Sequence, residues 1–210
     1  DPGFARSQRK PYVATLGGWG FNPATMGMPD VYAPDYASEV EKAAERQCAP
    51  LRDDPYLIGY FVGNEPPWPG RETELIKVIL DGDDTPMKAA LLKHLETGDT
   101  PENRRKFVYD TYSLFISMVN RAIKKYDPNH LNLGLRFGGD PPQDLVKASA
   151  SVGFDVFSLN IYNYSAGTER LDKIAGMTGL PIIIGEFHFG TPERGLSPGL
   201  RQTISQEERG

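Results

Sequence analysis

Short hydrophobic runs alternate along the chain with stretches in which apolar residues recur every three or four positions. The runs, each followed by Gly, Pro or Asn, predict five β-strands: Tyr12–Leu16, Tyr56–Val62, Leu131–Phe137, Val156–Tyr162 and Pro181–Phe187. The stretches between them have the spacing of helices. An order of strand, helix, strand, helix is typical of α/β proteins, in which consecutive strands pair in parallel.

Helix start and stop signals lie between the strands. Thr85-Pro86 and Thr100-Pro101 each place an N-capping threonine before a proline in the first turn. The first of these helices runs to Gly98, and Asp127-Pro128 ends the second. Three further helices are predicted: Asp35–Cys48, Asp144–Ser151 and Glu169–Met177.

Alternate residues of a strand point to opposite faces of a sheet. In the second strand, this rule places on one side Leu57, Gly59, Phe61, Gly63 and Glu65. In the third strand, it places Asn132, Gly134 and Arg136 on one side and Leu131, Leu133, Leu135 and Phe137 on the other. In the fourth strand, it places Ser158, Asn160 and Tyr162 on one side and Phe157, Leu159 and Ile161 on the other. In the fifth strand, Glu186 shares a side with Ile182 and Ile184. Polar or charged residues therefore collect at the carboxyl ends of the strands, as at the mouth of a barrel.

The other α/β architecture, an open doubly wound sheet, lacks its usual sequence support, because no glycine-rich nucleotide-binding loop follows any strand. The predicted fold class is therefore α/β, and the side-chain pattern favours a closed barrel of the TIM type over the open sheet. With 39% hydrophobic residues and 22 glycines in 210 residues, the composition is that of a globular domain. No apolar run has the length of a membrane span. A net charge of −5 argues against a nucleic-acid partner.

Cys48 is the only cysteine, which excludes an intrachain disulfide and a cysteine-based metal cluster. We interpret it as a small buried hydrophobic residue, because Ala44 and Leu51 lie near it at helical spacing. His94 and His130 lack the spacing of metal ligands. The sequence therefore predicts no metal site and no cofactor.

Two of the 28 acidic residues come directly after apolar strands: Glu65 follows Tyr60–Asn64, and Glu186 follows Ile182–Gly185. A single glutamate in such a place is usually a solvated loop residue or a salt-bridge partner. Two of them favour a function, because a charge at the end of a buried run costs desolvation energy unless it is paired or used. Two carboxyl groups in a polar cleft are what glycoside hydrolysis requires.

The segments Asp53–Glu65 and Ile183–Gly190 resemble a known family. Their sequences, DDPYLIGYFVGNE and IIGEFHFG, are similar to those of the clan A retaining glycoside hydrolases with a (β/α)8 barrel, and most similar to the β-agarase and β-galactosidase-like branches. The resemblance implies that Glu65 is the acid/base and Glu186 the nucleophile. It also implies that Asn64 binds a sugar 2-hydroxyl and that Tyr162 contacts the nucleophile.

Further residues are candidates for substrate binding. Arg136 either orients a carboxylate or binds a substrate hydroxyl, and an equal alternative is that it only neutralises nearby acids. Trp68 and Trp19 have positions that suit stacking on sugar rings, with loop packing as the alternative for both. Asn160, on the side of Tyr162, and His188, two residues beyond Glu186, are further candidates, and Asn163 and Tyr164 are expected to line the same mouth.

On this resemblance the chain holds strands three to seven only, since about ten residues precede Tyr12 and no strand pattern follows Gly190. A complete barrel takes about 250 residues. Five strands leave two sheet edges unpaired. We therefore expect residues 1–210 to be a single, partial catalytic barrel domain, completed by missing segments or by a partner chain.

The expected function is retaining hydrolysis of β-glycosidic bonds in a galactose-type poly- or oligosaccharide by double displacement, with that carbohydrate as the partner. One alternative is a non-catalytic carbohydrate-binding relative of the same barrel. Another is a metal-dependent hydrolase, which would need a ligand cluster that the sequence lacks. The sequence does not determine the localisation, and a secreted or periplasmic location is the expectation.

Overall fold

The computed structural model describes residue 3, residues 7–194 and residues 199–209. Its strands form a single sheet of five parallel strands in the order of the sequence: β1 (Tyr12–Thr15), β2 (Leu57–Asn64), β3 (Leu131–Gly138), β4 (Phe157–Asn160) and β5 (Ile182–Glu186). Each predicted strand is confirmed, with shifts of one or two residues at the ends.

The sheet is curled. Residues of β3 come within 8 Å of residues of β5, although β4 lies between these two strands. In a flat sheet two strand spacings would separate them by about 9.5 Å. The curl and the α/β order confirm the coarse fold class, while a complete eight-stranded barrel stays a prediction.

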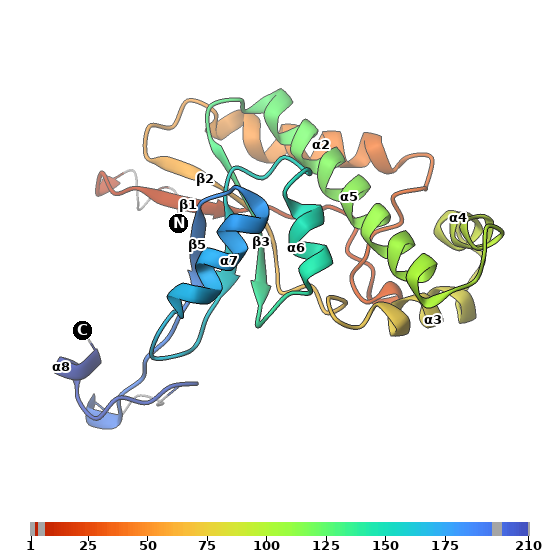
Figure 1. Cartoon of the computed structure of the whole chain (residues 1–210). Coiled ribbons are helices and arrows are strands. Elements are labelled where there is room, and N and C mark those ends of the chain that lie inside the picture. The colour runs from red at the N-terminus through yellow and green to blue at the C-terminus, as the bar shows by residue number, and fades with distance from the viewer. Residues whose placement is uncertain (1–2, 4–6, 195–198, 210) are drawn as a thin grey trace.

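Helices cover one face of the sheet, as Figure 1 shows for α2, α5, α6 and α7. The helices are α2 (Tyr36–Cys48), α3 (Glu72–Asp81), α4 (Pro86–Leu95), α5 (Pro101–Tyr126), α6 (Gln143–Ser149), α7 (Thr168–Thr178) and α8 (Gln206–Arg209), with short 3-10 turns η1 (Pro23–Thr25), η2 (Ala49–Leu51) and η3 (Pro192–Arg194). The predicted caps are confirmed: the side chains of Thr85 and Thr100 accept hydrogen bonds from the backbone N–H groups of Lys88 and Asn103.

Helix α3 was not predicted from the sequence. It lies in the long connection between β2 and α5, and its buried residues Leu75, Ile76 and Ile79 have the spacing of one helix face. That spacing is the signal that could have revealed it. The helix packs against α5, α4 and η1.

The larger hydrophobic core lies between the sheet and the helices. Tyr60 and Val62 of β2, Phe157 of β4 and Ile116 of α5 belong to it. A second, smaller cluster consists of Phe61, Leu133 and Val156, with Ile183 packed against it. Because Phe61 alternates with residues of the larger core, this second cluster lies on the opposite face of the sheet.

Cys48 is fully buried in the larger core, as the sequence predicted. Burial raises the pKa of its thiol to about 12.

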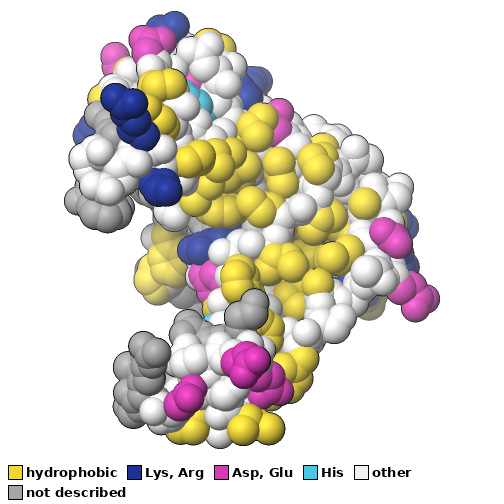
Figure 2. Space-filling model, turned by 90° about the vertical axis from the view of Figure 1, so that its left-hand side faces the viewer, with side chains coloured by type: hydrophobic (Ala, Val, Ile, Leu, Met, Phe, Trp, Pro, Cys, Tyr) yellow, Lys and Arg dark blue, Asp and Glu magenta, His cyan; other side chains and the backbone are white. Residues whose placement is uncertain are grey.

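Among the described residues, no helix has the length and apolar character needed to cross a membrane. On the face shown in Figure 2, hydrophobic side chains gather over the middle of the molecule, above the C-terminal segment.

A bulge in β3 overturns the alternation expected for that strand. Gly134, with a φ of +75°, follows Leu133 at a shift in the register with β2. Leu133 consequently belongs to the second cluster, whereas Leu135 belongs to the larger core. Asn132 donates a hydrogen bond to Asn120 of α5. The prediction that Asn132 and Arg136 share a side is therefore wrong, because the extra residue reverses the alternation between them.

The alternation in β2 also breaks at register shifts. Leu57 packs in the larger core and Phe61 in the second cluster, so the prediction that they share a side is wrong. In β4 the alternation holds: Phe157, Leu159 and Ile161 pack in the larger core, as predicted. The two outcomes differ because the register of β4 with β3 is uninterrupted.

Candidate active site

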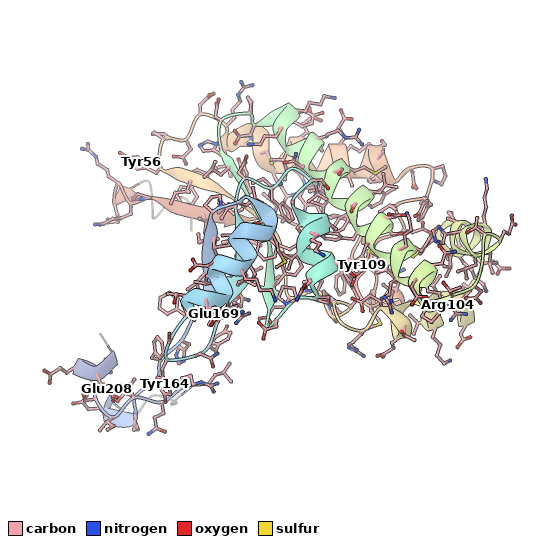
Figure 3. All side chains as sticks on the ribbon, viewed as in Figure 1. Tyr56, Arg104, Tyr109, Tyr164, Glu169 and Glu208 are labelled. Carbon is pink, nitrogen blue, oxygen red and sulfur yellow. The ribbon has the colours of Figure 1, made fainter. Side chains whose placement is uncertain are left out.

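The predicted site residues come from the carboxyl edge of the sheet. In Figure 3, Tyr56, just before β2, lies at the upper left of the molecule, and Tyr164, beyond the carboxyl end of β4, lies at the lower left. The carboxyl ends of parallel strands meet at one edge, so residues distant in sequence come together there. Glu65 and Glu186 both lie at this edge.

Glu65 lies one residue beyond β2 and has an unusual backbone conformation. Its φ of 41° is in the left-handed region, which residues other than glycine rarely adopt. Its N–H donates to the carbonyl of Arg136 at 2.8 Å, which fixes this backbone to β3. Local strain of this kind is concentrated at functional sites.

Asn160, at the end of β4, holds the Glu65 side chain. Its Nδ2 donates to Oε1 of Glu65 at 2.9 Å and to Oδ1 of Asn64 at 3.1 Å. Asn160 is only 3% exposed, so the amide is a fixed donor. The structure thus brings together three predicted site residues, Asn64, Glu65 and Asn160.

Glu186 is the last residue of β5, and both of its carboxyl oxygens have partners. Oε1 lies 3.0 Å from Nη1 of Arg136, and Oε2 accepts a hydrogen bond from the hydroxyl of Tyr162. The hydrogen bond to this carboxylate raises the pKa of Tyr162 above its ordinary value of 10. The Tyr162 hydroxyl is therefore a protonated donor at neutral pH.

A bulge turns Glu186 toward these partners. Leu159 pairs with Ile184 and Asn160 pairs with Glu186, which leaves Gly185 as an extra residue in β5. Simple alternation placed Glu186 on the side of Ile182 and Ile184, which pack against the larger core. That prediction is wrong, because the extra residue reverses the side on which Glu186 emerges.

Arg136 lies between Glu186 and the ring of Phe61 and contacts both. Its guanidinium lies over the ring of Phe61, 5.2 Å from the ring centroid, and it contacts Glu186 as described. This ion pair fits the orientation of a carboxylate, and it also fits the alternative that Arg136 only neutralises nearby acids. Arg136 reaches Glu186 because Gly185 leaves room, since a Cβ at position 185 would lie 2.6 Å from Cδ of Arg136.

Three buried polar atoms next to the glutamates have no hydrogen-bond partner among the described residues. They are Nε of Arg136, Oγ of Ser158 and Oδ1 of Asn160. Buried polar groups in proteins are nearly always paired, with protein, water or ligand. The site therefore suits a polar ligand. Ser158 is not among the predicted site residues, although it lies on the predicted side with Asn160.

His188 borders an open pocket of about 480 Å³ together with Tyr162, Glu186, Phe187 and Leu200. His188 and Glu186 therefore face the same pocket. Phe187 was missed, although it is the residue directly after Glu186 and is 67% exposed. An exposed aromatic ring beside a carboxylate suits contact with the C–H face of a sugar.

Asn163 and Tyr164 contact the C-terminal segment. Oδ1 of Asn163 accepts from Arg201 at 2.7 Å, and the hydroxyl of Tyr164 donates to the carbonyl of Gln202 at 2.6 Å. The ring of Tyr164 also stacks on Phe189. These contacts hold the C-terminal segment next to the candidate site.

Trp19 and Trp68, the two residues considered for stacking on sugar rings, are both buried in the structure. Trp19 is 6% exposed and Trp68 is 2% exposed. The ring of Trp68 packs against Tyr112, with 5.5 Å between the ring centroids. Both side chains belong to the larger hydrophobic core.

No group of three or more His, Cys, Asp or Glu side chains in the described part of the chain has an arrangement that could hold a metal ion. His130 instead contacts Asp127 and the carbonyl of Asp54.

Comparison with known proteins adds to this geometry. The sequence is similar to agarases. It is 29% identical to Beta-agarase A and 25% identical to Beta-agarase B, both of Vibrio sp. (strain JT0107). Each alignment covers all of this chain and 27% of the relative, so the chain spans about a quarter of the length of these curated relatives. No protein-family model matches the sequence.

Solved structures give the same result. The agarase AgWH50C aligns with 99% of this chain and 35% of its own, at a TM-score of 0.81 and 29% identity. PfGH50B aligns with all of this chain and 37% of its own, at a TM-score of 0.84 and 25% identity. The structure of an exo-beta-agarase shows the same fold at a TM-score of 0.83 and 23% identity. The resemblance to β-agarases is confirmed; the β-galactosidase-like branch stays a prediction.

Proposed function

We propose that this chain carries the active site of a glycoside hydrolase that cleaves β-glycosidic bonds in agarose, a galactose-type polysaccharide. The observation that carries the proposal is the pair of glutamates at one edge of the sheet, each held by different partners. The similarity to Beta-agarase A supports the substrate class. The partner of the chain would then be a carbohydrate.

The hydrogen-bond and ion-pair partners of the two glutamates suggest which role each carboxyl group has in the reaction. Glu186 has both oxygens oriented by Arg136 and Tyr162, which suits a carboxylate that attacks at a fixed angle. Glu65 is held by the uncharged amide of Asn160, which suits a group that gives up and regains a proton.

In the proposed reaction, Glu186 attacks the anomeric carbon while Glu65 donates its proton to the glycosidic oxygen, so the glycosidic bond breaks as a glycosyl–enzyme bond forms. Water then attacks the same carbon, and Glu65 takes its proton. The sugar leaves, and the Glu186 carboxylate is restored. Asn64, Arg136, Asn160 and His188 are proposed to contact or position the substrate around this centre.

The remaining strands of the barrel form part of the same proposal. Residues 1–210 would belong to one catalytic barrel domain, to which further segments or a partner chain contribute the other strands. The 35–37% coverage of AgWH50C and PfGH50B supports this interpretation.

Replacement of either glutamate tests the function. We expect Glu65→Gln and Glu186→Gln each to lower kcat on agarose on the order of 10⁴-fold, because an amide neither donates an acidic proton nor attacks carbon. Release of reducing ends measures kcat, and thermal unfolding checks the fold. Glu169→Gln, an exposed glutamate on α7 (Figure 3), is the matched control and retains full activity. Unchanged kcat in both site variants would refute the assignment.

The stereochemistry of the first product tests the double displacement. Two successive inversions at the anomeric carbon give a product with the β configuration of the substrate. Proton NMR during the first minutes of the reaction is therefore expected to show the β-anomer before mutarotation. Initial release of the α-anomer would instead make Glu186 a base that activates water, and the covalent step would be abandoned.

A further inference from the structure

A second pocket, of about 170 Å³, lies beside Asn64 at the same edge of the sheet. Its walls come from the loop after β1, from the end of β2 and from α5. The aromatic residues among them are Trp19, Phe21, Trp68 and Phe115. None of the described residues that line it carries a charge, so the pocket suits a neutral ligand.

Phe21 is the exposed aromatic residue of this pocket, and its ring is held in place. It is 69% exposed, yet its ring lies against the backbone of Gly27, where an added Cβ would approach Cε2 of Phe21 to 2.5 Å. Gly27 has a φ of +86°, and its N–H donates to the carbonyl of Asn22 at 2.8 Å. The loop thus presents an aromatic face from an ordered backbone.

Trp19 contributes an unused donor. Its carbonyl accepts from the hydroxyl of Tyr36 at 3.0 Å, which anchors the residue. Its indole Nε1 is buried and has no partner among the described residues. A buried N–H without a partner costs free energy, which a ligand hydroxyl at this position would remove.

We propose that this pocket is a subsite for one sugar ring of the galactan chain, adjoining the bond that is cleaved. The C–H face of the ring packs on Phe21, and a ring hydroxyl accepts a hydrogen bond from Nε1 of Trp19. Asn64 belongs both to the pocket and to the contacts around Glu65, which makes the two regions continuous. This inference rests on the proposed function and names a further binding residue, Phe21.

The chain carries its own reporter for this subsite. Trp19 and Trp68 are its only tryptophans, and both line the pocket. Titration of the wild-type protein and of Glu65→Gln with an agarose hexasaccharide is expected to give a saturable change in tryptophan emission. The variant keeps the sugar intact during the measurement. Maltohexaose, a glucose oligomer of equal length, is expected to give none.

Substitutions locate the binding. Phe21→Ala is expected to raise the Kd for the hexasaccharide about tenfold, and Phe21→Tyr, which keeps the ring, restores it. Trp19→Phe removes the N–H and is also expected to weaken binding. Leu92→Ala, which truncates a 51% exposed side chain on α4, is the control and leaves the Kd unchanged. Circular dichroism confirms that each variant is folded.

The outcomes separate this proposal from the proposed function. If the wild type cleaves agarose but its emission does not change, or if Phe21→Ala binds as tightly as the wild type, the subsite is refuted and the hydrolase stands. If the emission change depends on Phe21 but neither glutamate matters for cleavage, the subsite stands and the hydrolase is refuted.

Discussion

The space around the two carboxyl groups is set by glycines. A Cβ at Gly138 would lie 3.0 Å from Oε1 and 3.1 Å from Cδ of Glu65. Gly185 makes room for Arg136 in the same way. Neither glycine has a positive φ, so close approach, and not backbone conformation, is what requires a residue without a side chain.

Gly138→Ala is therefore expected to move the Glu65 carboxyl group by a few tenths of an ångström and to weaken its bond with Asn160. Misplacement of a catalytic group by 1 Å costs about 10²-fold in rate, so this smaller shift should lower kcat about tenfold. Initial rates on agarose measure the effect. Gly176→Ala on α7, where an added Cβ meets nothing within 4 Å, is the matched control. Equal kcat values for the two variants would contradict this explanation.

At the scale of elements, Asp127 joins the end of α5 to β2 and β3. Its carboxylate is fully buried and accepts from the hydroxyl of Tyr60 at 2.5 Å, from Nδ1 of His130 at 2.7 Å and from the N–H of Asn129 at 3.0 Å. Burial alone would raise the pKa of Asp127. The hydrogen bonds from Tyr60 and His130 outweigh it, so the pKa lies below its ordinary value of 3.8.

Asp127→Asn is expected to lower the free energy of unfolding by about 2 kcal/mol at pH 7, since hydrogen bonds to a charged group are lost. Because the folded pKa lies below the unfolded one, this stabilisation is present above about pH 4 and is lost as the pH falls through the folded pKa. Urea unfolding at pH 7 and pH 3 should therefore show a difference that shrinks in acid. Asp53→Asn, at an 83% exposed side chain, is the control. A difference that persists undiminished in acid would show that packing, and not charge, is responsible.

Bulges are the other feature of the elements that matters for the site. The extra residues at Leu133–Gly134 in β3 and at Gly185 in β5 decide that Arg136 and Glu186 meet. With strict alternation, Glu186 would emerge among the helices beside Ile184. Without the extra residue, the Glu186 carboxylate would be buried and unpaired. With it, Arg136 and Tyr162 hold the same carboxylate.

At the scale of the whole molecule, the curl of the sheet brings four strands to one site. Glu65, Arg136, Asn160 and Glu186 come from the ends of β2, β3, β4 and β5, and each contacts at least one of the others. Within the described residues, β1 and β5 each pair with one neighbour only, so both outer edges are open to further strands. The site therefore depends on the arrangement of the sheet and not on any one loop.

Several features of this protein were determined by its sequence alone. The five strands, the caps at Thr85 and Thr100 and the burial of Cys48 follow from local signals, because turn residues and apolar spacing act within a few positions of the chain. The position of Glu65 and Glu186 at one edge follows from the direction of parallel strands. Helix α3 was also readable from its spacing.

The tertiary structure decided the rest. Which side Glu186 faces, the burial of Trp19 and Trp68, and the exposure of Phe21 depend on contacts between segments far apart in sequence. A bulge leaves no mark in hydrophobic spacing, because the neighbouring strand selects it through backbone hydrogen bonds. Local sequence thus determines which elements form and in what order, whereas the packing between elements determines where their functional side chains point.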